Sequence, residues 1–234
     1  MIINSAPSTV LSDPEHRYAL AARKLSPQES VLDVGGYNDR RELIAKVIGN
    51  NFRYTPINSS SAWYGDSVTS ESFDGNCLPY KDMEFDTAIS VDTLEHVDPK
   101  DRASFIAEMI RVSNNIVLVT PFRDTSRPTL EPTFARISKL LKVEVKPSVK
   151  EHVEKGLPTL DKIRSYMGNQ PFNIKFGTDY TKFWQMIFLQ LVLNAIGRGK
   201  SKKINKLVQS IFEERLKTEE SLDRSTAYRV IVST

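Results

Sequence analysis

The sequence predicts an α/β fold in which a Rossmann-like sheet carries helices on both of its faces. Short apolar runs typical of buried strands occur at residues 30–36, 85–92 and 114–122. Segments with helical spacing lie among them, at 41–49 and 98–112. This alternation favours a parallel sheet joined by right-handed crossovers.

Two helix starts are indicated by capping residues. Ser12, with Glu15 three positions later, forms a capping-box pattern that begins a helix reaching to about Leu25. Asp98 is the expected N-cap of the helix over 98–112, with Pro99 at its first position.

The length of 234 residues suits one large domain, or one domain with an elaborated insertion, and the composition is ordinary for a globular protein. The net charge of +3 is too small to indicate nucleic-acid binding by itself. Cys77 is the single cysteine, so neither an internal disulfide nor a thiolate metal site is expected. We see no metal-ligand spacing and expect no metal. The N-terminal residues lack the pattern of a secretory signal, which predicts a cytoplasmic protein.

The second half of the chain is predicted to be mainly helical between two late strands. A strongly apolar segment is the most prominent of its helices. The expected helices are 133–142, 158–168, 183–197 and 204–216, and the expected strands are 172–176 and 227–234.

Acidic residues and glycines follow the predicted strands at their carboxyl ends. Asp33, Gly35 and Gly36 close the first strand, and Asp92 closes the strand over 85–92. In a parallel sheet such positions border one ligand crevice. Glycines let the backbone turn sharply and approach a ligand closely. A tight turn without any ligand would produce the same pattern, so the first segment alone does not decide.

In combination, these segments resemble the class I S-adenosylmethionine-dependent methyltransferases. The resemblance rests on "VLDVGG", on "FDGNCLPYKDMEFDTAISVDTLEHV" and on "FIAEMIRVSNNIVLVTPF", and covers about residues 29–122. It implies a seven-stranded sheet with the last strand antiparallel, so that 172–176 and 227–234 form the final hairpin. It also implies a single domain with three parts and an insertion: an N-terminal helical segment 1–28, a cofactor-binding half 29–122, an acceptor-side half 123–234 and a helical insertion at about 181–218.

The resemblance implies S-adenosylmethionine as cofactor and assigns a role to each matching position. Asp33, Gly35 and Gly36 match the motif that wraps the methionine part. Asp74 matches the acid that meets the adenine amino group. Further positions are expected to border the adenine (Phe73, Gly75 and Cys77) or to lie under the methionine moiety near the methyl group (Ser90, Val91 and Asp92).

This sequence departs from the family pattern at three positions. Tyr37 and Asp39 stand where the family's loop usually has more glycine. Asn58 is the nearest candidate for the family's ribose-binding acid, and a neutral amide accepts more weakly than a carboxylate. For Glu95 and His96 we favour a structural role in anchoring their loop.

The acceptor side is predicted from the segment 151–158 and Phe122, which follows a strand on the crevice side. His152 is a candidate general base because an imidazole titrates near neutral pH, and Asp92 is the other candidate catalytic residue. A surface histidine on a short helix is an equally good interpretation of His152.

We expect the acceptor to be a small molecule or a glycan-type or lipid-linked intermediate. The stretch "EHVEKGLPTLDKI" resembles methyltransferases found near glycan-assembly enzymes. The alternative function is a methyltransferase fold that has lost turnover and acts as a binding protein. The apolar helix followed by a basic loop, 183–206, is compatible with contact to a membrane surface, but we favour a core helix. We expect no nucleic-acid partner. We expect the protein to be a monomer or a homodimer.

Overall fold

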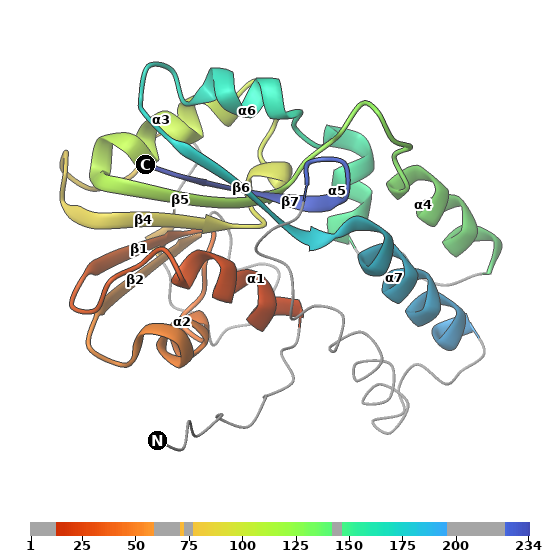
Figure 1. Ribbon diagram of the computed structural model, residues 1–234, viewed down its shortest axis with the longest axis horizontal. Coiled ribbons are helices and arrows are strands. Elements are labelled where there is room, and N and C mark those ends of the chain that lie inside the picture. Colours follow the sequence, from red (N-terminus) through yellow and green to blue (C-terminus); the bar gives the residue numbers. More distant parts are fainter. Residues whose placement is uncertain (1–12, 59–70, 73–76, 142–146, 196–222) are drawn as a thin grey trace.

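The computed structural model describes residues 13–58, 71–72, 77–141, 147–195 and 223–234, which build one mixed sheet covered by helices (Figure 1). The sheet order is β3-β2-β1-β4-β5-β7-β6. The strands are β1 (Ser30–Val34), β2 (Arg53–Asn58), β3 (Glu71–Ser72), β4 (Phe85–Val91), β5 (Ser113–Pro121), β6 (Asn173–Asp179) and β7 (Ala227–Ser233). The helices are α1 (Asp13–Ala22), α2 (Arg40–Ile48), the short 3₁₀-helix η2 (Leu94–His96), α3 (Arg102–Val112), α4 (Glu131–Leu140), α5 (Pro147–Lys155), α6 (Leu160–Tyr166) and α7 (Tyr180–Ala195).

The pairing of the strands confirms the Rossmann-like mixed sheet. Strand β1 pairs in parallel with β2 and β4, β2 with β3, and β4 with β5. Strand β7 runs antiparallel to both β5 and β6. The final hairpin expected from residues 172–176 and 227–234 is therefore present. The carboxyl ends of the parallel strands meet at one edge, where ligands bind in sheets of this type.

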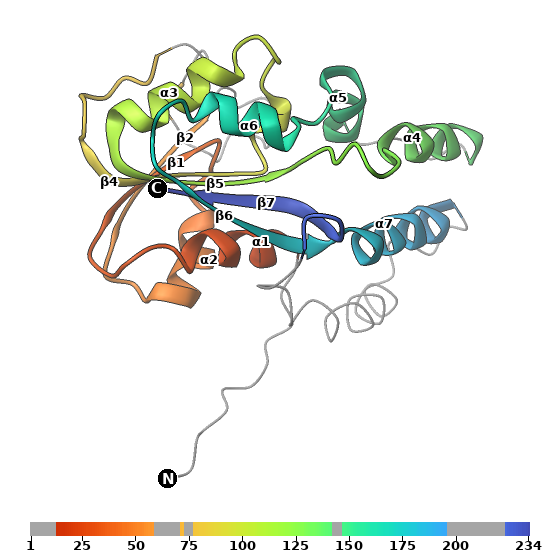
Figure 2. The same ribbon diagram turned by 45° about the horizontal axis from the view of Figure 1, so that its top comes forward.

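Two hydrophobic layers sandwich the sheet, with α3 and α6 on one face and α1 and α2 on the other (Figure 2). Leu32 of β1 packs in the same cluster as Ile106 of α3. Its neighbour Val31 packs instead with Ala21 of α1 and Ile44 of α2. Successive side chains of a strand point to opposite faces, so a strand covered on both faces appears in the sequence as a continuous apolar run.

The predicted N-cap of the third helix is wrong: α3 begins at Arg102, and residue 98 lies in the turn before it. The Asp98 carbonyl accepts a hydrogen bond from the Asp101 N–H at 2.8 Å. The Asp98 carboxylate forms an ion pair with Lys155 at 3.2 Å. The side chain that was expected to cap the helix therefore binds another element. Ser12, the other expected cap, lies outside the described residues.

Helix α7 follows β6 directly and is packed on the protein, as expected for the first part of the insertion. The Phe183 ring stacks on Tyr228 of β7, with centroids 4.1 Å apart. The Phe188 ring meets Phe134 of α4 at 5.8 Å. Residues 196–222, which include the rest of the expected insertion, lie outside the described residues. Among the described helices, none has the length and apolar character needed to cross a membrane.

Candidate active site

Two loops meet at the carboxyl edge of the sheet, one after β1 and one after β4. Gly35 has a φ of 92°, which favours glycine, and a β-carbon at this residue would lie 2.2 Å from the Thr93 hydroxyl oxygen. The Gly35 N–H donates to the Ile57 carbonyl at the end of β2. Glycine is thus required by both the conformation and the close approach of the two loops.

Asp33 is fully buried at the end of β1 and is only partly satisfied by the protein. Its Oδ2 accepts from the hydroxyls of Tyr18 at 2.9 Å and Tyr54 at 2.6 Å. Its Oδ1 is buried and has no hydrogen-bond partner among the described residues. Burial raises the pKa of Asp33 to about 6, although the two tyrosine hydroxyls act in the opposite direction. Gly36 leaves room for the carboxylate, because a β-carbon there would lie 2.1 Å from it.

The structure gathers some of the sequence-predicted cofactor residues and leaves others undescribed. The Asn58 amide donates to the Gly35 carbonyl at 3.3 Å, so the end of β2 is tied to the same loop. Val91 and Ser90 point to opposite faces of β4; the Ser90 hydroxyl oxygen is buried without a partner in the described part of the chain. Cys77 is exposed. Phe73, Asp74 and Gly75 lie outside the described residues.

Asp92, just past β4, is held by two arginines that sequence reasoning missed. Arg229 of β7 donates from Nε to Oδ1 at 2.9 Å and from Nη2 to Oδ2 at 2.6 Å. Arg17 of α1 donates to Oδ2 at 2.9 Å. Burial raises the pKa of this carboxyl, but the two guanidinium groups outweigh burial and hold it well below its usual range. Asp92 is therefore poorly suited to accept a proton. The sequence did contain one sign of Arg229, because a charged residue inside the apolar run "AYRVIV" needs a partner.

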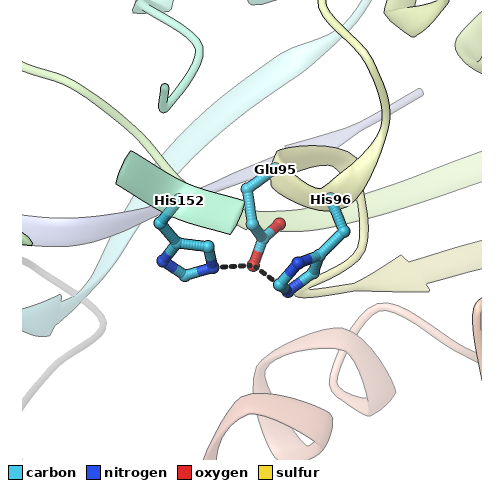
Figure 3. A group of neighbouring side chains, drawn as sticks. All are labelled: Glu95, His96 and His152. Atoms are coloured by element: carbon cyan, nitrogen blue, oxygen red, sulfur yellow. Dashed lines mark ion pairs between the residues drawn. The ribbon is translucent and has the colours of Figure 1, made fainter. Parts of the chain in front are cut away.

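Glu95, His96 and His152 form a cluster at the same edge (Figure 3). Both imidazoles turn their Nε2 atoms toward one oxygen of Glu95, at 3.9 Å for His96 and 3.8 Å for His152. Burial and the nearby negative charge of Asp92 raise the pKa of Glu95 to about 8. Burial and the neighbouring His96 lower the pKa of His152 to about 4. Glu95 and His96 thus contact His152 of α5 in addition to residues of their own loop.

Two basic side chains fasten α5 to η2 and so bring His152 to Glu95. The buried Arg102 donates to the carbonyls of Glu95 at 3.3 Å and Gly156 at 2.7 Å. The Lys155 ammonium donates to the His96 carbonyl at 2.6 Å. Phe122, expected to line the acceptor side, is instead buried against Phe176, with ring centroids 5.8 Å apart.

Comparisons with known proteins agree with this architecture. The family described as "Methyltransferase domain" matches residues 35–115. The fold is shared with a putative methyltransferase from an antibiotic biosynthesis pathway of Anabaena variabilis, at 13% identity over 94% of this chain and 99% of the other, with a TM-score of 0.53. No curated protein sequence matches the chain significantly.

Two further solved structures share the fold at similarly low identity. Phosphoethanolamine N-methyltransferase 2 of Haemonchus contortus, in complex with S-adenosyl-L-methionine, has 14% identity and a TM-score of 0.53, over 92% of this chain and 51% of the other. The cyclopropane synthase MmaA2 of Mycobacterium tuberculosis has 15% identity and a TM-score of 0.51, over 94% and 81%. The chain therefore carries a methyltransferase domain with the class I fold. The family match covers about a third of the chain, and the solved structures share its fold.

The Asp92 ion pairs predict a large loss of stability on removal of Arg229. Arg229→Leu leaves a buried carboxylate with only the partly exposed Arg17, so urea denaturation should show a loss of about 3–5 kcal/mol. Asp92→Asn in the same chain removes the stranded charge and should restore part of the loss, since asparagine tolerates the φ of 47° at this residue. Arg164→Leu, an exposed ion pair, is the matched control, with an expected change of about 0.5 kcal/mol or less. Equal stability of Arg229→Leu and the control would contradict this account.

The raised pKa of Asp33 predicts a pH-dependent cost of keeping it in the fold. The pKa of Asp33 is about 6 in the folded protein and 3.8 in the unfolded chain. Below about pH 4 the group is protonated in both states, so its burial costs no stability. The free energy of unfolding then falls as the pH rises to about 6. The full cost is on the order of 3 kcal/mol, at about 1.4 kcal/mol per pKa unit. The free energy of unfolding of Asp33→Asn, minus that of the wild type, should therefore rise between pH 4 and pH 7.5.

Proposed function

We propose that this protein transfers the methyl group of S-adenosylmethionine to a small-molecule acceptor at the carboxyl edge of β1 and β4. The observation that carries this is the buried Asp33 carboxylate, whose Oδ1 lacks a partner among the described residues. An ammonium group is a suitable donor for such an oxygen, because a charge-assisted hydrogen bond compensates the burial of the carboxylate. S-adenosylmethionine has an ammonium group in its methionine part.

The surrounding residues support the same assignment. Gly36 leaves the carboxylate without a covering side chain, and Gly35 allows the loop to bend toward β4. Asn58 holds the Gly35 carbonyl from β2, where the resemblance places the ribose. We assign Asp33, Gly35 and Gly36 to the methionine part of the cofactor, and Asn58 to the ribose. Asp74, Phe73, Gly75 and Cys77 remain proposals for the adenine.

Catalysis at such a site rests on positioning. When bound, the cofactor supplies an electrophilic methyl group on a sulfonium sulfur. The residues of this chain hold the donor and orient the acceptor, an effect worth up to about 7–11 kcal/mol in favourable cases. The ion pairs of Asp92 with Arg17 and Arg229 fix the end of β4, between the residues around Asp33 and the cluster of Glu95, His96 and His152. We assign Asp92, with Ser90 and Val91, to this positioning role.

The acceptor side is best placed at the cluster of Glu95, His96 and His152. Its polar atoms lie at the same edge as Asp92, and the segment 151–158, from which the sequence predicts the acceptor side, contributes one of them. A histidine whose pKa is about 4 is a weak proton acceptor at neutral pH, so His152 is poorly suited to be the general base. The acceptor class that we propose is a polar small molecule, such as a glycan-type or lipid-linked intermediate.

Cofactor binding tests the assignment of Asp33. Asp33→Asn removes the charge that pairs with the ammonium group, so calorimetry with S-adenosylhomocysteine should show a loss of roughly 10–100-fold in affinity, as expected for a hydrogen bond to a charged group. Asp39→Asn makes the same charge change on the same loop at an exposed carboxylate and should bind like the wild type. Equal affinity in the two variants would overturn the assignment.

Turnover distinguishes an enzyme from a binding protein. The full chain is incubated with methyl-labelled S-adenosylmethionine and separate panels of hydroxyl, amine and glycan-type acceptors, and released S-adenosylhomocysteine is measured. We expect labelled product with at least one panel and a drop of at least about tenfold for Asp33→Asn at limiting cofactor. Tight cofactor binding with no product from any panel would favour the alternative function, a methyltransferase fold that serves as a binding module.

A further inference from the structure

The cluster of Glu95, His96 and His152 has the composition and arrangement of a metal site. One carboxylate oxygen and two imidazole nitrogens, from η2 and α5, all lie within 4.8 Å of one another. The Glu95 Oε1 is 3.9 Å from His96 Nε2 and 3.8 Å from His152 Nε2, too far for a direct hydrogen bond. Figure 3 shows both rings directed at the same carboxylate.

The distances are close to those that a metal ion imposes. Nitrogen and oxygen ligands of zinc lie at about 2.0–2.2 Å from the ion, so neighbouring ligand atoms of a tetrahedral site are about 3.4 Å apart. The two separations from Glu95 exceed this value by about half an ångström. The remaining separation, between the ligand atoms of the two imidazoles, lies within 4.8 Å, and rotation of the three side chains is the movement that binding requires.

Hydrogen bonds behind two of the ligands orient them toward the common centre. Nδ1 of His96 contacts a Glu151 oxygen at 2.6 Å. A carboxylate at this nitrogen favours a proton on Nδ1, which leaves the lone pair of Nε2 facing Glu95. The Thr120 hydroxyl donates to Oε2 of Glu95 at 3.1 Å, which leaves Oε1 on the side of the histidines. Metal-ligating histidines characteristically have such a partner.

The two segments that supply the ligands are fixed to each other independently of any ion. Arg102 donates to carbonyls of both segments, at Glu95 and Gly156, and Lys155 donates to the His96 carbonyl. Glu95 is 1% exposed. The site is thus built on a rigid frame and does not depend on a chance meeting of surface side chains.

We propose that Glu95, His96 and His152 bind one divalent transition-metal ion of the zinc class. Two imidazoles and one carboxylate suit zinc and its neighbours, whereas magnesium and calcium prefer oxygen ligands. Three protein ligands leave a coordination position open, as in catalytic sites. This assignment revises the expectation of no metal, because the sequence separates ligands that the fold brings together.

The role of the ion rests on the proposed function. If the acceptor carries a hydroxyl group, a cation at the open position lowers the pKa of that hydroxyl. The oxygen loses its proton to solvent and forms the new bond to the methyl carbon, while the bond between that carbon and the sulfonium sulfur breaks and leaves a neutral thioether.

Calorimetry on the tag-free, metal-depleted full chain tests the site with Zn²⁺ and Mg²⁺ as probes. We expect one Zn²⁺ per chain and no comparable binding of Mg²⁺. His152→Gln and Glu95→Gln each remove a ligand, so each should weaken Zn²⁺ binding strongly. The expected loss exceeds the roughly 10–100-fold that is typical when only the hydrogen-bond partner of a ligand is removed. Glu154→Gln, an exposed carboxylate on the same helix, is the control and should bind Zn²⁺ like the wild type. Co²⁺ loading should give visible absorption bands that disappear in His152→Gln.

Three outcomes would overturn the proposal: no stoichiometric Zn²⁺ binding, unchanged Zn²⁺ affinity in His152→Gln, or a preference for Mg²⁺. Binding of S-adenosylhomocysteine measured on the same samples separates this result from misfolding, since His152→Gln should keep the wild-type affinity for it. The two proposals also fail separately. Cofactor binding without Zn²⁺ binding removes the metal site and leaves the methyltransferase, whereas Zn²⁺ binding without turnover leaves the metal site and removes the role assigned to it.

Discussion

The carboxyl edge of the sheet depends on the ion pairs that join Asp92 to Arg229 and Arg17. They connect three elements: the end of β4, the antiparallel strand β7 and helix α1. Arg229 stands opposite Pro121 of β5 and Gly177 of β6. A one-residue slip of β7 would turn Arg229 to the other face of the sheet and leave Asp92 without its main partner. The buried charge of Asp92 therefore favours one register of β7. Burying this carboxylate costs free energy, and its ion pairs with the two arginines offset that cost.

Three carboxyl groups at this edge differ because their surroundings differ. Asp92 has two arginines, and its pKa is held low. Asp33 has two tyrosine hydroxyls, and burial raises its pKa to about 6. Glu95 has one hydroxyl partner and the negative charge of Asp92 nearby, and its pKa reaches about 8. Carboxyl groups with strongly perturbed pKa values that gather in one place indicate a candidate functional site, because catalytic and binding groups are often tuned by burial and neighbouring charges.

Much of the fold could be predicted from the sequence, since its determinants are local. Apolar runs closed by glycine, aspartate and proline mark β1, β4 and β5, and the pairing of β6 with β7 follows from the resemblance to the family. The start of α3 could not be predicted, because the Asp98 carboxylate binds Lys155, a residue distant in sequence. The same limit applies to the site. Asp33, Gly35 and Gly36 form one local motif, whereas the partners of Asp92 and Glu95 come from other elements.

Arg102 brings His152 close to Glu95, although no local sequence pattern predicts this contact. Helix α5 ends at Lys155 and is followed by Gly156, whose φ of 66° suits a helix C-terminus and whose N–H donates to the His152 carbonyl at 3.1 Å. Arg102 then binds the carbonyl of Gly156, a favourable place for a cation at the end of a helix, and with the same guanidinium the carbonyl of Glu95. His152 lies one turn before this cap, so its distance to Glu95 is set by backbone groups on both sides. The contacts of Arg102 and Lys155 hold the two segments together without a direct hydrogen bond between His152 and Glu95. A buried carboxylate held beside two imidazoles in this way is the arrangement expected of a site prepared for a further ligand.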